Sequence, residues 1–445
     1  MARDSRTSTR KPGHSTDKQQ LTQDGFTFLH AADIHLDSPL VGLERYGDAP
    51  VDELRGATRR AFQALVDAAI EEAVAFVLLA GDLYDGDWKD YNTGLFFAQQ
   101  MARLADAGID VFVVSGNHDA ANQFTKSLRT PSRVRKFSTS HAETHRLPDL
   151  QVAIHGRGFA TREVTEDLSR TFPEPVQGWF NIGLLHTSLD GRPGHATYAP
   201  CSLNGLLANR YDYWALGHVH AREIVHENPW IVFPGNLQGR HSRETGPKGC
   251  TLVAVVDGNV RDVREIHLDV LRWENLPVDL SGATTPDEVM ACVTGEMRAS
   301  VANADGRMVA LRLGLHGKTR AHPTLMAHPE HFRQELRALA LDCCGDRLWL
   351  EKVQFSTQGH DAAVPDAGDG EAIATLLRTM KELKADEELI AELTRQFLEL
   401  RAKLPDDLVG PGALEPLDPA SPEVLSGVVA EARELLLARL ASGER

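Results

Sequence analysis

The chain has 445 residues, of which 42% are hydrophobic and 25% charged, and its mean hydropathy is −0.28. That length exceeds one hydrophobic core of ordinary size, so two or three folded units are expected. The composition excludes a fibrous or membrane-spanning protein. The net charge of −16 argues against nucleic-acid binding, but residues 356–445 alone hold 18 acidic and 9 basic residues. The sign of the whole chain therefore does not decide what the remainder binds.

Cysteine usage and the N-terminal segment bear on the compartment. The five cysteines are odd in number and lack the spacing of a zinc site, which favours a reducing compartment over a disulfide framework. The first 24 residues carry almost no apolar side chains, so they contain no hydrophobic signal-peptide core and have the composition of a disordered tail. Together these features predict a cytoplasmic protein that does not associate with membranes.

Three predicted strands alternate with two predicted helices at the start of the folded region. Residues 26–32, 76–80 and 111–114 are short apolar runs typical of buried strands. Between them, apolar residues recur at helical spacing within residues 51–75 and again from Leu95 to Leu104. This β-α-β-α-β order predicts a parallel sheet with connecting helices, and each strand runs into polar residues.

Beyond Ala120 the pattern predicts a second sheet and then further units. Short apolar runs without long helices between them occur at residues 151–154, 182–185, 213–216, 231–233 and 251–256. From about Leu271, strands at 277–280, 308–315 and 348–355 alternate with helices at 289–301 and 332–340, which predicts a small α+β unit.

A Gly/Asp/Ala-rich linker after Gln358 separates this unit from two predicted helices. The first helix runs from about Glu371 to Lys403. The second is predicted to begin at Ser421 and Pro422, because serine is a good N-cap and proline is favoured at the first helical position.

Five polar segments follow the predicted strands, and they offer carboxylate, amide and imidazole ligands. Such side chains, with no thiolate among them, suit manganese, iron or zinc. Binding sites of open α/β sheets lie at the carboxyl ends of the parallel strands. Seven candidate ligands exceed the coordination of one ion and fit two ions that share a carboxylate, about 3.5–4 Å apart. The segments are Asp33-x-His35, Gly81-Asp82-x-x-Asp85, Gly116-Asn117-His118-Asp119, Leu185-His186 and Gly217-His218-x-His220.

Each segment alone also has an ordinary structural explanation. An Asp-x-His pair arises by chance, alternate histidines on a strand can be solvated, and a single histidine such as His186 is more often a core residue with satisfied hydrogen bonds. Five such segments in this order, each at the end of an apolar run, favour a metal centre over coincidence.

The order of the segments resembles the calcineurin-like metallophosphoesterase superfamily. Within it, the chain is similar to SbcD-type DNA repair exonucleases, and above all to their YhaO branch. The resemblance covers residues 26–355. The stretches that carry the narrower resemblance are HAADIHLDSPL (30–40), GDLYDGDWKDYNTG (81–94), SGNHD (115–119), YAPCSLNGL (198–206), ALGHVHAREIV (215–225) and FPGNLQGRHSRETGPKGC (233–250).

The resemblance implies an α/β (α+β) fold in which two sheets form a sandwich flanked by helices. Together with the composition along the chain, it divides the chain into a disordered tail (1–24), a nuclease domain (25–270), a small α+β capping domain (271–356), and a linker with a helical partner-binding segment (357–445). It also implies two divalent ions, with manganese as the expected metal. One ion would be held by Asp33, His35, Asp82 and His220, and the other by Asp82, Asn117, His186 and His218.

By the same resemblance, His118 is not expected to bind metal. It would donate a proton to the leaving oxygen, with Asp85 orienting its ring, because ions that produce the nucleophile still leave the departing alkoxide without a proton. Some nuclease relatives carry histidine at the position of Asp85, and both forms occur in the family.

Basic side chains near the expected site predict contacts with substrate phosphates. Residues 121–146 hold six basic residues and one acidic residue, and a second basic group begins at Arg240. A solvated loop is the alternative explanation for the first group. The predicted substrate contacts are Lys126, Arg129, Arg133, Arg135, Lys136, Arg240 and Arg243.

The favoured hypothesis is a two-metal-dependent DNA phosphodiesterase, an exonuclease of DNA repair that works with a coiled-coil ATPase. Helices after the small domain dock on such a partner in the SbcD family, so the C-terminal helices are predicted to contact an SbcC- or YhaN-like ATPase. Packing of the two helices on each other is the alternative, and a homodimer is carried over from the family as a further option. Two other functions stay open: a metallophosphoesterase acting on nucleotides or phosphoproteins, and a non-catalytic scaffold for DNA ends or an ATPase.

Overall fold

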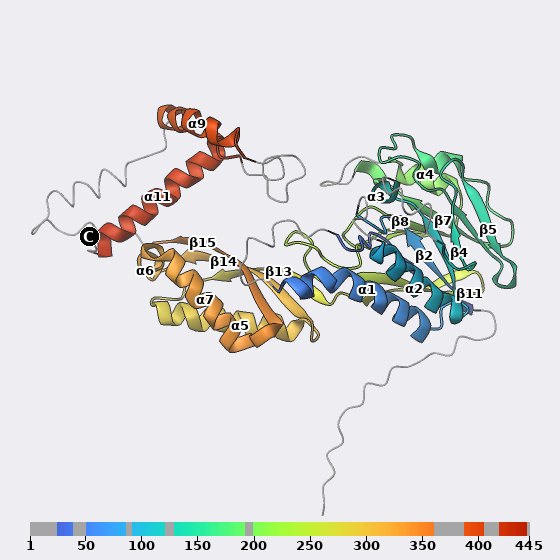
Figure 1. Ribbon diagram of the computed structural model, residues 1–445, viewed down its shortest axis with the longest axis horizontal. Helices are drawn as coiled ribbons and strands as arrows, with labels where there is room; N and C mark the ends of the chain where they lie inside the picture. Colours follow the sequence, from blue (N-terminus) through green and yellow to red (C-terminus); the bar gives the residue numbers. More distant parts are fainter. Residues whose placement is uncertain are drawn as a thin grey trace, which may run out of the picture. The chain divides into compact units, whose positions relative to one another are not determined.

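The structure, a computed structural model, describes residues 25–38, 50–85, 91–120, 129–191, 199–359, 387–404 and 418–442 (Figure 1). These residues form two compact units. The first contains the described residues within 1–40, 52–239 and 247–270, and the second contains those within 41–51, 240–246 and 271–445. Among the described residues, none of the helices has the length and apolar character needed to cross a membrane.

The first unit contains two six-stranded sheets. In the first sheet the strand order is β12-β11-β1-β2-β3-β4. Strands β1 to β4 run parallel, while β11 is antiparallel to both β1 and β12. The parallel strands therefore end at one common edge. The strands are β1 (Gly25–Ala31), β2 (Phe76–Ala80), β3 (Asp110–Val114), β4 (Val134–Lys136), β11 (Gly249–Val256) and β12 (Asn259–His267).

The second sheet has the order β5-β6-β7-β8-β10-β9. Strands β6, β7, β8 and β10 are parallel, and the edge strands β5 and β9 are antiparallel to their neighbours. The strands are β5 (Glu143–Leu147), β6 (Val152–Gly156), β7 (Phe180–His186), β8 (Tyr213–Gly217), β9 (Glu223–Glu227) and β10 (Trp230–Phe233).

The sequence of the central strand β2 is apolar throughout because both faces of the strand are buried. Phe76, Leu78 and Ala80 point into the core between the two sheets, while Val77 and Leu79 point to the opposite face. Successive side chains of a strand alternate between faces, so a strand covered on both sides has no polar position. Each large side chain that is fully buried in this way contributes about 1.5–3 kcal/mol.

Helices cover the outer face of the first sheet. Helix α1 (Val51–Glu71) buries Phe62 and Leu65 against this face, and α2 (Asn92–Asp106) buries Phe97 and Met101 beside them. A separate apolar cluster around Trp214 and Phe233 covers the outer face of the second sheet, with α4 (Leu203–Ala208) contributing Leu206. The two sheets and their covering helices therefore form a four-layered first unit.

The second unit is built on a three-stranded parallel sheet in the order β13-β14-β15. Helices α5 and α7 pack on one of its faces, and a single apolar cluster joins them to the sheet. Thr285 caps α5 by accepting a hydrogen bond from the Glu288 N–H at 3.3 Å. The elements are β13 (Leu271–Asp279), α5 (Pro286–Asn303), β14 (Met308–Lys318), α6 (His322–Ala327), α7 (Pro329–Cys344) and β15 (Leu348–Gln358).

Two C-terminal helices follow, α9 (Glu387–Arg401) and α11 (Pro422–Ser442). The Ser421 hydroxyl accepts the Val424 N–H at 3.4 Å, so the predicted N-cap is present. Helix α11 packs against α6 and buries Leu425. Residues 371–386 of the predicted first helix lie outside the described part of the chain, as do the predicted N-terminal tail and most of the predicted linker.

The predicted fold class is confirmed: two sheets with flanking helices, a small α+β unit and C-terminal helices. The pattern missed the edge strands β5, β9 and β12 and the short strand β4, and it started β13 six residues too late, at Pro277 instead of Leu271. Edge strands pair on one side and face solvent, so their sequences are polar and lack a bounded apolar run. Strand β12, which reads NVRDVREIH, is an example.

Candidate active site

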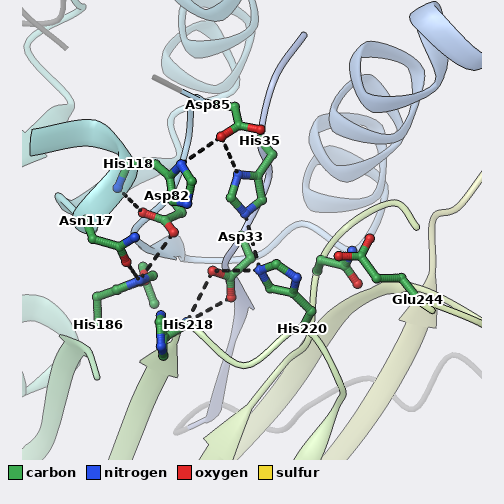
Figure 2. A network of polar contacts seen from close by, with 12 residues as sticks. Asp33, His35, Asp82, Asp85, Asn117, His118, His186, His218, His220 and Glu244 are labelled. Atoms are coloured by element: carbon green, nitrogen blue, oxygen red, sulfur yellow. Dashed lines mark hydrogen bonds and ion pairs between the residues drawn. The ribbon is translucent and has the colours of Figure 1, made fainter. Parts of the chain in front are cut away.

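The predicted metal ligands and the predicted catalytic pair lie together at the carboxyl ends of strands from both sheets. The parallel strands of each sheet end at one edge, and the two edges meet there. Figure 2 shows the side chains directed toward one another. They follow or end β1, β2, β3, β7 and β8, and they are Asp33, His35, Asp82, Asp85, Asn117, His118, His186, His218 and His220.

The backbone of the site is strained at four of these positions. Asp33 (φ 51°), His35 (φ 47°), Asp82 (φ 51°) and His218 (φ 107°) all have positive φ, which is unfavourable for residues other than glycine. Such conformations cost about 1–3 kcal/mol each and persist only where the surrounding structure enforces them. Here the Asp33 N–H donates to the Gly81 carbonyl and the His35 N–H to the Asp82 carbonyl, both at 3.0 Å. The loops after β1 and β2 therefore hold each other in place.

Two glycines allow the loops to approach closely. A Cβ atom on Gly116 would lie 2.2 Å from Asp82 Oδ1, and one on Gly217 would lie 2.0 Å from the Ala80 carbonyl oxygen. No side chain fits at either distance. Glycine at these positions is therefore a geometric requirement of the site.

One group of donor atoms comprises Asp33, His35 and His220. The Nε2 atoms of His35 and His220 are 3.3 Å apart, and His220 Nε2 is 3.9 Å from Asp33 Oδ1. The donor atoms of the three residues all lie within 4.8 Å of one another. Two imidazole nitrogens and a carboxylate at this separation match the donor set of a divalent ion.

A second group forms around Asp82 and His186. His186 Nε2 is 3.4 Å from Asp82 Oδ2 and 3.0 Å from Asn117 Oδ1. His186 Nδ1 lies 2.9 Å from the Ala80 carbonyl oxygen, which can only accept, so this nitrogen carries a proton and Nε2 faces the site. Asp33, Asp82 and His186 also place donor atoms within 4.8 Å of one another.

His218 joins the site in a different way. Its backbone N–H donates to both carboxylate oxygens of Asp33, at 3.2 and 2.9 Å. Its ring lies 5.2 Å from the His186 ring, centroid to centroid, but it belongs to none of the compact donor groups found among the described residues. The structure thus places His218 beside the second group without bringing its nitrogen into that group.

The predicted catalytic pair is in contact. His118 Nδ1 lies 2.7 Å from Asp85 Oδ1, and the His118 side chain is 29% exposed. Burial would raise the pKa of Asp85, but the hydrogen bond from His118 and the nearby His35 hold that pKa well below its usual range. Asp85 therefore stays ionised and orients the imidazole. His118 also lies near His35 and Asp82, and the three place donor atoms within 4.8 Å of one another.

Burial and mutual attraction act against each other in the cluster. Burial lowers the pKa of His186, but the charges of Asp82 and Asp33 outweigh this and raise it to about 9. Burial alone would raise the pKa of Asp82, but the His186 imidazole holds it below its usual range. For Asp33, burial prevails and the pKa is raised. The buried carboxylates are therefore held in place partly by a protonated histidine.

This environment fits divalent ions. Asp33, His35, Asp82 and His186 are at most 2% exposed, and buried charges require pairing or metal coordination. The donors are carboxylate, imidazole and amide groups with no thiolate, as expected for manganese, iron or zinc. An ion would replace the proton on His186 as the partner of the carboxylates.

Sequence reasoning gave no role to Asp119 and Ser38. The Asp119 carboxylate accepts backbone N–H groups of Leu83 (2.9 Å), Tyr84 (3.1 Å) and Gly116 (3.0 Å), which joins the loops after β2 and β3. Burial, with the nearby charge of Asp82, raises its pKa to about 7.

Lys248 and Ser38 also contact site residues. The buried Lys248 Nζ donates to the His220 carbonyl at 3.1 Å, and the Ser38 hydroxyl donates to Asp85 at 2.6 Å. In the sequence, Lys248 belongs to the basic group that begins at Arg240, for which phosphate positioning is the expectation. No sequence signal indicates that it binds a backbone carbonyl.

The structure separates the predicted substrate contacts. Arg133 and Arg135 pair with Asp110, at 3.2 and 3.8 Å, and Asp110 begins β3 at the end of the strand remote from the metal ligands. Lys136 lines a cavity of ≈ 340 Å³ beside the short helix α3 (Asn117–Ala120), together with Asp119 and Phe159. Of the remaining predicted contacts, Arg129 lies in the described segment that leads into β4, and Lys126 lies outside the described residues. Arg240 and Arg243 belong to the second unit, where Arg240 pairs with Glu244 at 3.1 Å.

Comparisons with known proteins agree with this geometry. The profile of the calcineurin-like phosphoesterase family matches residues 26–222, and that of the middle domain of metallophosphoesterase YhaO matches residues 273–358. A Bacillus subtilis protein described as uncharacterized metallophosphoesterase YhaO is 35% identical over 65% of this chain and 72% of its own length.

More distant relatives are described as DNA double-strand break repair protein Mre11. The protein from Sulfurisphaera tokodaii is 26% identical over 54% of this chain and 62% of its own length, and the protein from Aeropyrum pernix is 26% identical over 57% and 63%. The match to a solved structure of a dimetal phosphatase from Danio rerio covers 52% of this chain and 93% of that protein's chain. The two are 15% identical with a TM-score of 0.31, and this similarity is too low to support a conclusion.

The matches to the phosphoesterase and YhaO profiles lie in different parts of the chain, and the B. subtilis relative exceeds 30% identity over most of its length. Membership of this family indicates a metal-dependent phosphoester hydrolase. The chain belongs to the calcineurin-like metallophosphoesterases and is a relative of YhaO.

Proposed function

We propose that this protein is a two-metal-dependent phosphodiesterase that degrades DNA from its ends. Its main support is the convergence of six of the seven candidate ligands, from five strand ends, beside the His118–Asp85 pair. Two ions held by such a set of carboxylate and imidazole groups would stabilise both the attacking and the leaving oxygen of an in-line displacement at phosphorus.

In this proposal, Asp33, His35, Asp82 and His220 would hold one ion. Asp82, Asn117, His186 and His218 would hold the other, with Asp82 shared between the two, and manganese is the expected metal. Bound ions would supply a deprotonated water as the nucleophile and offset charge on the phosphoryl oxygens. His118, oriented by Asp85, donates a proton to the departing oxygen.

DNA is the proposed substrate because the Mre11 relatives are named as DNA double-strand break repair proteins. Lys136, at the carboxyl end of β4, is the basic residue best placed to contact a phosphate of a bound strand. Arg129, Lys126, Arg240 and Arg243 stay predictions. Arg133 and Arg135 are weaker candidates, since Asp110 already balances their charge.

We extend the proposal to the rest of the chain. Residues 25–270 would form the nuclease domain, 271–356 a capping domain, and 357–445 a linker and partner-binding segment. The cytoplasmic location and the homodimer remain predictions.

The partner-binding segment would contact a coiled-coil ATPase. Val428 and Leu436 on α11 are about half exposed, at 51% and 48%, although α11 already packs on α6. Replacing both by glutamate should abolish co-purification with a co-expressed YhaN- or SbcC-like ATPase. Leu341→Glu, at a 65% exposed position of α7, is the matched control and should leave it intact.

The substrate is tested with the purified full-length protein, Mn²⁺ and DNA labelled at its ends. Linear duplex or single-stranded DNA should be degraded progressively, while closed-circular DNA of the same sequence should persist and a chelator should stop the reaction. The co-expressed ATPase is added in a second arm. No action on any DNA, with rapid hydrolysis of a small phosphodiester, would instead favour a nucleotide substrate.

A further inference from the structure

Ser38 lies beside the catalytic pair and has no place in the mechanism so far. Its hydroxyl donates to Asp85 Oδ2 at 2.6 Å, while Asp85 Oδ1 lies 2.7 Å from His118 Nδ1. The two contacts engage both oxygens of one carboxylate. We propose that Ser38 is a positioning residue that fixes Asp85, and through it the His118 imidazole, for proton donation to the leaving group. The inference rests on the proposed function and adds a third member to its catalytic pair.

The position of Ser38 is fixed by its neighbour Asp37. The Asp37 carboxylate accepts hydrogen bonds from Arg59 Nε at 2.6 Å and from the Thr93 hydroxyl at 2.5 Å. Its backbone N–H donates to the Thr58 hydroxyl at 3.2 Å. Thr58 and Arg59 lie on α1 and Thr93 lies on α2. The segment that carries Ser38 is thus attached to both helices that cover the first sheet.

The segment also continues directly from the loop of Asp33 and His35. Asp37 has a φ of 56°, a strained value that the contacts to the helices sustain. The Ser38 N–H donates to the His35 carbonyl at 3.1 Å. Ser38 therefore links the loop of the candidate metal ligands to the carboxylate that orients His118.

The geometry of His118 makes its orientation consequential. With Nδ1 engaged by Asp85, Nε2 is the nitrogen that can deliver a proton to a substrate. The ring of His35 stands across the ring of His118, at 84° and 5.0 Å between centroids. A ring that is hydrogen-bonded to Asp85 and packed against the His35 ring is restricted in rotation. Loss of the Ser38 hydroxyl would release Asp85 at its second oxygen and loosen this restraint.

The step that depends on His118 can be written in full. The oxygen of a deprotonated water bonds to phosphorus, the bond from phosphorus to the leaving oxygen breaks with its electron pair on that oxygen, and the His118 proton moves to it. A leaving group that is already a stable anion gains little from this proton. A poor leaving group depends on it. Misplacement of His118 should therefore slow only the second kind of substrate.

The test uses two thymidine 5′-phosphate diesters that differ only in the leaving group, 4-nitrophenyl or phenyl. With Ser38→Ala, kcat for the phenyl ester should fall about three- to tenfold, the effect of one lost hydrogen bond of ordinary net strength. The kcat for the nitrophenyl ester should change less than about twofold, and KM should stay the same for both. Ser38→Thr, which keeps a hydroxyl, should restore the phenyl ester rate.

Ser300→Ala is the matched control, because it removes a serine-to-carboxylate hydrogen bond to Glu274 in the second unit. It should alter neither rate. A measurement on metal-free protein is independent of turnover: the His118 Nδ1–H, followed by NMR of the imidazole, should exchange with water faster in Ser38→Ala than in Ser38→Thr or wild type.

The outcomes distinguish a failure of the proposed function from a failure of the role proposed for Ser38. If the wild type hydrolyses neither ester, the proposed function fails and this inference falls with it. If the wild type hydrolyses both, but Ser38→Ala slows them equally or not at all, the inference alone is wrong. Unchanged proton exchange at His118 in Ser38→Ala would overturn it as well.

Discussion

Replacing Gly217 by alanine tests whether the two sheets form the site by close approach. The new Cβ would lie 2.0 Å from the Ala80 carbonyl oxygen and 2.9 Å from His186 Nδ1. An ordinary contact needs about 3.4 Å or more, so the ends of β2 and β8 would have to separate by about 1.4 Å. The same movement would break the bond from His186 Nδ1 to the Ala80 carbonyl, now 2.9 Å long.

We expect Gly217→Ala to destabilise the metal-free protein by about 2–4 kcal/mol, the sum of an overpacked contact and one lost buried hydrogen bond. Because the lost bond orients a candidate ligand, metal affinity should also fall about 10- to 100-fold. Urea unfolding followed by circular dichroism and calorimetric metal titration measure the two effects.

Gly295→Ala is the control, since a Cβ there, within α5, meets nothing within 4 Å. It should be neutral or slightly stabilising, as alanine favours helix. If Gly217→Ala behaved like this control, with unchanged stability and metal affinity, the close approach of the two sheets at the site would be refuted.

Three further outcomes are expected. Asp82→Asn should lower the bound metal, measured by elemental analysis, from two ions to fewer than two per chain, and an unchanged count would remove Asp82 as the bridge. The pKa of His186 is raised to about 9, so its imidazole is protonated at about pH 7.5 and an ion must displace that proton. Metal titration in weak buffer should therefore release about one proton more from the wild type than from His186→Gln; equal release would contradict the raised pKa. Phe76 is fully buried and stacks on Phe28 at 5.0 Å between ring centroids. Phe76→Ala should therefore lower the free energy of unfolding in urea by about 3–5 kcal/mol, and a decrease below about 1 kcal/mol would contradict this packing.

The sequence predicted the gathering of the site because its ligands obey a topological rule. Asp33, Asp82 and Asn117 follow three parallel strands of one sheet, and His186 and His218 follow two of the other. Residues after parallel strands meet at a common edge whatever the loop details are. The apolar strands were equally visible, because both faces of strands such as β2 are buried.

Contacts that depend on distant backbone were not predictable. Asp119 stands in the same tetrapeptide as His118. Its carboxylate, however, accepts hydrogen bonds from the N–H groups of Leu83 and Tyr84, which lie 36 and 35 positions earlier in the chain. Lys248 reaches the carbonyl of a residue 28 positions earlier. Neither contact leaves a periodicity or a spacing in the chain. The Ser38–Asp85 hydrogen bond, which spans 47 positions, is hidden for the same reason.

The basic residues show the opposite difficulty. Arg133 and Arg135 form a conspicuous cluster in the sequence, and a phosphate-binding role was the natural prediction. In the structure their guanidinium groups pair with Asp110, and Arg135 also lies over the Phe112 ring at 5.4 Å. A run of charges gives no information about which of them the fold neutralises.

The most direct test of the central claim measures bound metal and DNA cleavage on the same samples of wild type and His118→Ala. The account predicts about two ions per chain in both proteins. It also predicts that His118→Ala degrades end-labelled DNA about 10²- to 10⁴-fold more slowly with Mn²⁺. A metal count well below two in the wild type, or full activity in His118→Ala, would contradict the account.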